Sequence, residues 1–130
     1  MIPTIFYNAT IMETGRKNDL LDLTFEFAID IMCFVEILEE KKRWVIARQV
    51  LKSGTSIGAN AREAQSAESI SDFIHKLKIA DKEAVETEYW LLLCKLAPNY
   101  PDPDELLIKI IRIRKLLSAI IKTSKQKLHP

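Results

Sequence analysis

Apolar residues recur at helical spacing along almost the whole chain, in four stretches separated by short polar or proline-rich segments. Apolar positions three and four residues apart are typical of an amphipathic helix that packs one face against a core. Outside the first dozen residues, no stretch alternates apolar and polar positions as a half-buried strand does. The pattern predicts helices over residues 19–39, 43–67, 71–96 and 104–124. With short connections, these form a single all-α domain over residues 1–130, an antiparallel up-down-up-down four-helix bundle that carries an N-terminal extension over residues 1–17.

Capping residues and prolines support these boundaries. Asn18 or Asp19 can cap the first helix, and Ser69 with Asp72 is placed to form a capping box at the third. The segment "APNYPDPDE" contains three prolines, which end the third helix before the fourth begins. The first helix is apolar around most of its circumference, which predicts two packing partners, within the bundle or in another subunit. Its single acidic stripe consists of Asp19, Asp22, Glu26 and Asp30.

The second helix contains a stripe of small residues within "LKSGTSIGANAREAQSAES", residues 51–69. A phosphate-binding loop needs G-x-x-x-x-G-K-[ST] after a buried strand, whereas this segment has G-x-x-x-G, no following lysine and no preceding strand. Each glycine inside a helix costs about 1 kcal/mol relative to alanine, so an intimate helix contact is the expected compensation. The stripe predicts a face for close helix packing, formed by Ala47, Gly54, Gly58, Ala61 and Gln65.

Two carboxylates of the third helix, Asp81 and Glu88, fall on a face that is otherwise apolar. One interpretation is a catalytic or metal-binding acid pair, because buried carboxylates acquire shifted pKa values and di-metal bundles use inward glutamates. The other is a structural network in which each carboxylate is paired. We favour the network, because Asp72 and His75 supply only one of the two carboxylate–histidine pairs that a di-iron bundle needs. The candidate partners are Arg48, Arg62, Asn60 and Lys95.

Composition adds little further chemistry. The 130 residues include 19 Lys or Arg and 18 Asp or Glu, so the net charge of +1 is not that of a strongly basic nucleic-acid binder. Cys33 and Cys94 form no C-x-x-C motif and predict two free, mostly buried thiols of a reducing compartment. No secretory signal pattern and no apolar run of roughly 20 residues is present. We therefore expect a cytoplasmic protein with no membrane segment, no cofactor, no metal and no catalytic residue.

Two segments carry a family resemblance. "LKSGTSIGANAREAQSAES" followed by "DFIHKLKIADKEAVETEYWLLL" resembles the signature of the 23S ribosomal RNA intervening-sequence protein family, also called four helix bundle proteins. "NDLLDLTFEFAIDI" and "LEEKKRWVIARQVLKSG" extend the likeness over nearly the whole chain. The resemblance implies a four-helix bundle that assembles into a ring-like homopentamer and has no established enzymatic activity. The family is similar in fold to the accessory protein of diversity-generating retroelements, which is pentameric, binds nucleic acid and partners a reverse transcriptase.

The resemblance also marks structural or assembly positions, none of them catalytic. Those on the second helix are Gly54, Ser56, Gly58, Asn60 and Glu63, and those on the third helix are Asp81, Lys82, Glu83, Glu86, Glu88, Tyr89 and Trp90.

Two functions from different classes remain open, and the first is an oligomeric nucleic-acid-binding scaffold. After Glu105 the chain contains no acidic residue. Arg112, Lys115 and Lys122 share one face of the fourth helix, and an oligomer repeats that patch, which predicts sequence-independent contacts with phosphates of RNA or DNA. The partner is then nucleic acid or a nucleic-acid-processing protein. The predicted contact residues are Arg112, Lys115, Lys122, Lys125 and Lys127.

The alternative is a protein–protein assembly module with no nucleic-acid role. In this hypothesis the charged face of the fourth helix is simply solvated, and the acidic stripe of the first helix neutralises it within or between subunits. The module presents Trp44, Trp90 or the apolar segment "IFYNATIM", residues 5–12, to a protein partner, because large aromatic side chains are common interface anchors.

Overall fold

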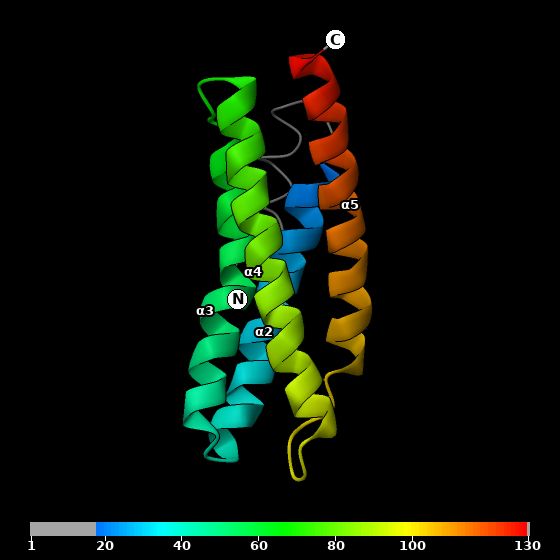
Figure 1. Ribbon diagram of the computed structural model, residues 1–130. Helices are drawn as coiled ribbons and strands as arrows, with labels where there is room; N and C mark the ends of the chain where they lie inside the picture. The colour runs from blue at the N-terminus through cyan, green and yellow to red at the C-terminus, as the bar shows by residue number, and fades with distance from the viewer. Residues whose placement is uncertain (1–17, 130) are drawn as a thin grey trace.

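The computed structural model describes residues 18–129, which form four α-helices and, within that range, no β-strand (Figure 1). The helices are α2 (Asp19–Glu40), α3 (Trp44–Ala64), α4 (Ile70–Leu96) and α5 (Asp104–Leu128). Successive helices run in opposite directions, so the predicted all-α antiparallel four-helix bundle is confirmed. The N-terminal extension over residues 1–17, with its apolar segment 5–12, lies outside the described residues.

Each helix packs against two others, and α3 and α5 occupy opposite corners of the bundle. α3 contacts α2 and α4, and α5 contacts the same two helices. The first helix thus has two packing partners within its own chain, α3 and α5. Part of its apolar circumference stays accessible, since Leu21, Leu23 and Ile29 are half-buried and Met32 and Ile37 are exposed. A partner in another subunit stays a prediction.

Side-chain caps fix the starts of α2 and α4. Asn18 Oδ1 accepts a hydrogen bond from the Leu21 N–H at 3.1 Å, and Ser69 Oγ accepts one from the Asp72 N–H at 3.0 Å. The Asp72 carboxylate accepts from the N–H of Glu68 at 3.2 Å, one residue before the cap. The predicted capping box therefore forms with its return bond displaced by one residue.

Two helix ends differ from the sequence-based expectation. α3 ends at Ala64, three residues early, because the next N–H groups bond three residues back, as in Gln65 N–H to Arg62 O at 3.1 Å. Such bonds tighten the chain into a turn and stop the helix. α5 continues to Leu128, four residues beyond the predicted end at residue 124. Lys125 and Lys127 lie in its last turn, where their positive charges stabilise the negative end of the helix dipole.

One apolar core runs through the bundle, and its α4 side differs from the predicted face. The sequence places Asp81 and Glu88 on the apolar face of this helix, whereas in the structure the residues just before them, Ala80 and Thr87, are the buried ones. The helix is thus rotated relative to the expectation, and Ile70 and Leu92 are exposed. The buried residues of α4 are Ile74, Leu77, Ala80, Ala84, Thr87, Leu91 and Cys94.

The glycines of α3 allow a close approach to α2. A Cβ atom at Gly54 would lie 2.8 Å from Ile31 Cγ1 and 2.9 Å from Cγ2, and one at Gly58 would lie 3.2 Å from the Thr24 carbonyl oxygen. On its other side, α3 meets α4 through a buried hydroxyl pair. Thr87 Oγ1 donates to Ser53 Oγ at 2.9 Å, and Ser53 Oγ donates to the Gln49 carbonyl at 3.0 Å. The predicted close-packing face is therefore present.

Candidate nucleic-acid interface

The predicted basic residues belong to α5, which starts after Pro103 and ends at Leu128 (Figure 1). By helical periodicity, Lys115 and Lys122 lie opposite the buried Ile113, and Lys125 lies toward α4. All five side chains are exposed. Within residues 18–129 none of them forms an ion pair or hydrogen bond, so their charges face solvent without compensation from an acid. The five are Arg112, Lys115, Lys122, Lys125 and Lys127.

The other cations along α5 are paired instead. Lys109 forms an ion pair with Asp30 of the acidic stripe on α2. The hydrogen bond to Asp30 is the main cause that raises the pKa of Lys109 above its ordinary value. Desolvation opposes it, and the charges of Asp30, Glu105 and Glu26 add smaller upward contributions. One acid of the stripe, Asp30, therefore neutralises one cation of α5, Lys109, and none of the five predicted contact residues.

Arg114 is paired with both anomalous carboxylates of α4. Its Nη1 lies 3.3 Å from Glu88 Oε1, and its Nε lies 3.6 Å from Asp81 Oδ1. The side chains of Asp81 and Glu88 are 32% and 25% exposed, so neither is a buried acid. The structural network is thus present.

The four partners predicted for Asp81 and Glu88 from the sequence were wrong, because these carboxylates face α5 and pair with Arg114. Asn60 instead donates to the Ser56 carbonyl of its own helix at 2.8 Å, and Lys95 pairs with Asp104 at 3.1 Å. Arg48 and Arg62 lie exposed on α3. Arg114 could not be selected from spacing alone, since the rotation of α4 decides which neighbouring helix its carboxylates reach.

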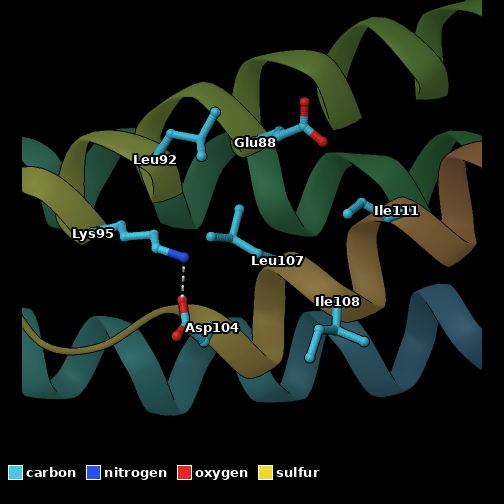
Figure 2. Close-up of a pocket in the computed structure, with 7 residues that line it drawn as sticks. All are labelled: Glu88, Leu92, Lys95, Asp104, Leu107, Ile108 and Ile111. Atoms are coloured by element: carbon cyan, nitrogen blue, oxygen red, sulfur yellow. Dashed lines mark ion pairs between the residues drawn. The ribbon is translucent and has the colours of Figure 1, made fainter.

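Grooves run along the α4–α5 boundary at both ends. Near the start of α5, an apolar groove of about 550 Å³ is closed at one end by the Lys95–Asp104 pair. Figure 2 shows Leu92 of α4 and Leu107 of α5 pointing toward one another in it, with Ile108 and Ile111 further along α5.

Toward the end of α5, a second groove of about 610 Å³ is lined by basic side chains of both helices. Lys78 of α4 joins Lys122 and Lys125 of α5 there, with His129 at the last turn. Sequence reasoning missed Lys78. Lys78 belongs to α4, so its closeness to the basic residues of α5 becomes apparent only when α4 and α5 are known to be neighbours.

No candidate catalytic arrangement forms among the described residues. His75 is exposed, and the Asp72 carboxylate is used in the capping box of α4, where it accepts from the Glu68 N–H. Within residues 18–129, no group of three or more His, Cys, Asp or Glu is placed to hold a metal ion. None of the four helices is long and apolar enough to cross a bilayer.

The two cysteines differ in environment, which corrects one expectation. Cys94 is buried as predicted, and burial raises the pKa of its thiol from 9.0 to about 11. Cys33 is exposed beside a groove between α2 and α5, and not buried. The apolar sequence around Cys33 concealed this, because α2 has outward-facing apolar residues such as Met32.

The remaining family positions lie mostly on the surface of α3 and α4. Ser56 Oγ donates to the Lys52 carbonyl at 2.6 Å within its own helix. Burial, and then the neighbouring charge of Glu86, raise the pKa of Glu83, while Lys52 lowers it. Their role in assembly stays a prediction. The exposed positions are Glu63, Lys82, Glu86 and Tyr89, and Trp90 is half-buried against the core.

Apolar side chains also remain exposed on the outside of α4 and α5. Val85, Tyr89 and Leu92 follow one another at helical spacing on α4, and the stripe ends at Leu96, which is 83% exposed. On α5, Ile108 is 70% exposed. The exposed apolar residues of the α4 stripe lie at helical spacing, so they face the same side of α4.

The fold and these surfaces define a four-helix-bundle protein with an apolar outer stripe and a basic outer helix. The chain belongs to the 23S rRNA-intervening sequence protein family, whose family model matches residues 16–119. A similar solved structure is the crystal structure of a protein with unknown function from the S23 ribosomal protein family of Bacteroides thetaiotaomicron VPI-5482. It is 45% identical, with a TM-score of 0.76, over 79% of this chain and 98% of that one. No match is found among curated proteins.

Proposed function

We propose that the protein is a non-enzymatic, oligomeric scaffold in the cytoplasm that binds RNA or DNA through the outer face of α5. The observation that carries this proposal is the set of five exposed cations on α5 that have no acidic partner within residues 18–129. Solvated lysines and arginines without fixed counter-charges release condensed counterions when they meet phosphates, which provides sequence-independent affinity. The resemblance to pentameric, nucleic-acid-binding bundles supports the same function.

Oligomer formation multiplies this contact. The exposed apolar stripe of α4, with Ile108 and Ile111 of α5, supports burial against a second copy. A closed ring of identical subunits repeats the basic helix at regular intervals. Linked phosphate contacts of this kind gain avidity, because after the first subunit binds the others act at high effective concentration. A subunit with a net charge of only +1 can therefore still bind a long polyanion.

The test is fluorescence anisotropy of labelled single-stranded DNA, hairpin RNA and duplex DNA with the purified protein at about 50 and 200 mM salt. Six or more phosphate contacts should weaken binding by about 10³-fold or more over this range. A variant in which Arg112, Lys115 and Lys122 are changed to Glu should lose binding. Absence of wild-type binding at the lower salt concentration would rule out the scaffold and favour the protein–protein assembly module.

A matched control separates the α5 face from net charge alone. Lys41, Lys42 and Arg48 are also exposed cations, and they lie at or near the α2–α3 turn. Changing these three to Glu alters the net charge by the same amount as the α5 variant. Equal losses in the two variants would contradict a localised interface. Light scattering of each variant measures the oligomeric state in the same samples.

A further inference from the structure

The basic groove at the end of the α4–α5 boundary differs from the rest of the basic face in having cations on two walls. Lys78 comes from α4, while Lys122 and Lys125 come from α5. Ser118 and Ile121 also line the groove, so its surface between the cations is short and uncharged. A phosphate in this groove would meet positive charge from both sides, whereas one on the outer surface of α5 meets it from one side only.

The single acid in the groove does not cancel these charges. Asp81 lines the groove, but its Oδ1 faces Arg114 Nε at 3.6 Å. Within residues 18–129, Lys78, Lys122 and Lys125 have no ion pair of their own. Three uncompensated cations therefore surround the groove, and His129 adds a ring at its open end.

The stiffness of the polyanion decides which form can enter the groove. Duplex DNA is a stiff rod with a persistence length of about 150 base pairs, so it does not bend into a local concavity between two helices such as α4 and α5. A duplex would rest on the exposed row of α5 and leave the groove empty. A single strand can follow the groove with its phosphates between the two walls.

We infer that this groove binds the phosphodiester backbone of a single-stranded segment, RNA or DNA, with Lys78 opposite Lys122 and Lys125. The inference rests on the proposed function and deepens it, since it assigns single strands to the groove and duplexes to the outer row of α5. Lys78 is then a binding residue for single strands only.

The experiment compares Lys78→Gln and Lys78→Glu with the wild-type protein, using labelled 20-nucleotide single-stranded DNA, RNA of the same sequence and the 20-base-pair duplex. Loss of one phosphate contact should reduce the salt slope for single strands by about 0.7 and weaken binding about fivefold at 0.1 M salt. Lys78→Glu should weaken it further. Duplex affinity should stay within twofold of wild type in both variants.

Arg48→Gln and Arg48→Glu are the matched controls, because Arg48 is an exposed cation of α3 outside the groove. These variants should bind single strands as the wild type does. Circular dichroism and thermal unfolding verify that each variant is folded, which is expected because Lys78 is exposed.

The outcomes distinguish this inference from the proposed function. Suppose that the wild type binds nucleic acid and the α5 variant does not. If Lys78→Gln then binds single strands with unchanged affinity and salt slope, the single-strand site in the groove is ruled out, while the proposed scaffold function stands. Equal losses for single strands and duplex in Lys78→Gln also rule out the single-strand site. If the wild type binds no nucleic acid, both proposals fail.

Discussion

α3 and α5 contact the same two helices from opposite corners of the bundle, yet they do so by different chemistry. α3 meets α2 through glycines and meets α4 through a buried hydroxyl pair. α5 contributes apolar core residues but adds ion pairs at its edges, from Lys109 to α2 and from Arg114 to α4. The groove beside Gly58, between α2 and α3, is about 140 Å³, whereas those along α5 are about 350–610 Å³. The α3–α4 side is looser at one end, where Ile46 and Cys94 line a groove of about 410 Å³.

The difference shows how one small bundle separates stability from recognition. Close contacts at α3 exclude water and leave little room for change, because a packed interior responds to even one added methyl group. Partly exposed ion pairs at α5 contribute little to stability, so the outer surface of α5 can carry unpaired charge at small cost to the fold. The three predictions below test this contrast.

The largest expected difference is in thiol reactivity. Cys33 opens onto the groove between α2 and α5, while Cys94 is 2% exposed and its thiol pKa is raised to about 11 by burial. Relative to a thiol at 9.0, this lowers the thiolate fraction about 100-fold at pH 8. Maleimide labelling of Cys94→Ser should therefore be fast, and that of Cys33→Ser at least 100-fold slower. Similar rates would contradict the contrast in burial, and labelling in denaturant checks that both thiols are intact.

The second prediction concerns the α2–α3 contact. Gly54→Ala adds a Cβ within 3 Å of both γ carbons of Ile31, which is fully buried and cannot move aside. Overpacking costs about 1–3 kcal/mol, and the gain in helix propensity returns about 1 kcal/mol. We expect a net loss of up to about 2 kcal/mol in the free energy of unfolding, measured by urea denaturation.

A double-mutant cycle with Ile31→Ala identifies the cause of that loss. Ile31→Ala removes the atoms that the new Cβ would meet, so Gly54→Ala should cost less in this background than in the wild type. A Gly54→Ala variant more stable than the wild type would show that α3 is not closely packed against α2.

The smallest effect is expected at the α5 ion pairs. Arg114→Met keeps the apolar stem but removes the charge that faces Asp81 and Glu88. Because all three side chains are partly exposed, the loss should be about 1 kcal/mol or less and should shrink in 1 M salt. Lys127→Met, on the same helix and without a partner among the described residues, is the control and should be neutral. A loss above that of Gly54→Ala would reverse the comparison between α3 and α5.

Much of the fold could be predicted from the sequence, because each helix carries a clear period and a local stop signal. The glycine stripe predicted close packing on α3 without indicating that Ile31 of α2 is the residue in contact. The rotation of α4 could not be predicted, since Ala80 and Thr87 carry too little hydrophobic signal to mark a buried face. That rotation decides that Asp81 and Glu88 meet Arg114, and that Lys78 lies beside α5. Which side chains meet at the surface therefore depends on how each helix is rotated against its neighbours, whereas the helix boundaries depend mainly on local sequence.

The buried bond between Thr87 and Ser53 has a consequence for the vertical alignment of the helices. Apolar side chains on α3 and α4 are largely interchangeable, so hydrophobic contact alone would tolerate α4 sliding along α3 by one turn. Such a shift of about 5.4 Å would separate the two hydroxyls. Neither would lose its last partner, because Thr87 Oγ1 also lies 2.7 Å from the Glu83 carbonyl oxygen and Ser53 Oγ lies 3.0 Å from the Gln49 carbonyl oxygen. The bond between the hydroxyls therefore favours the observed axial register of α4 on α3 by about 1 kcal/mol, the usual net contribution of one hydrogen bond.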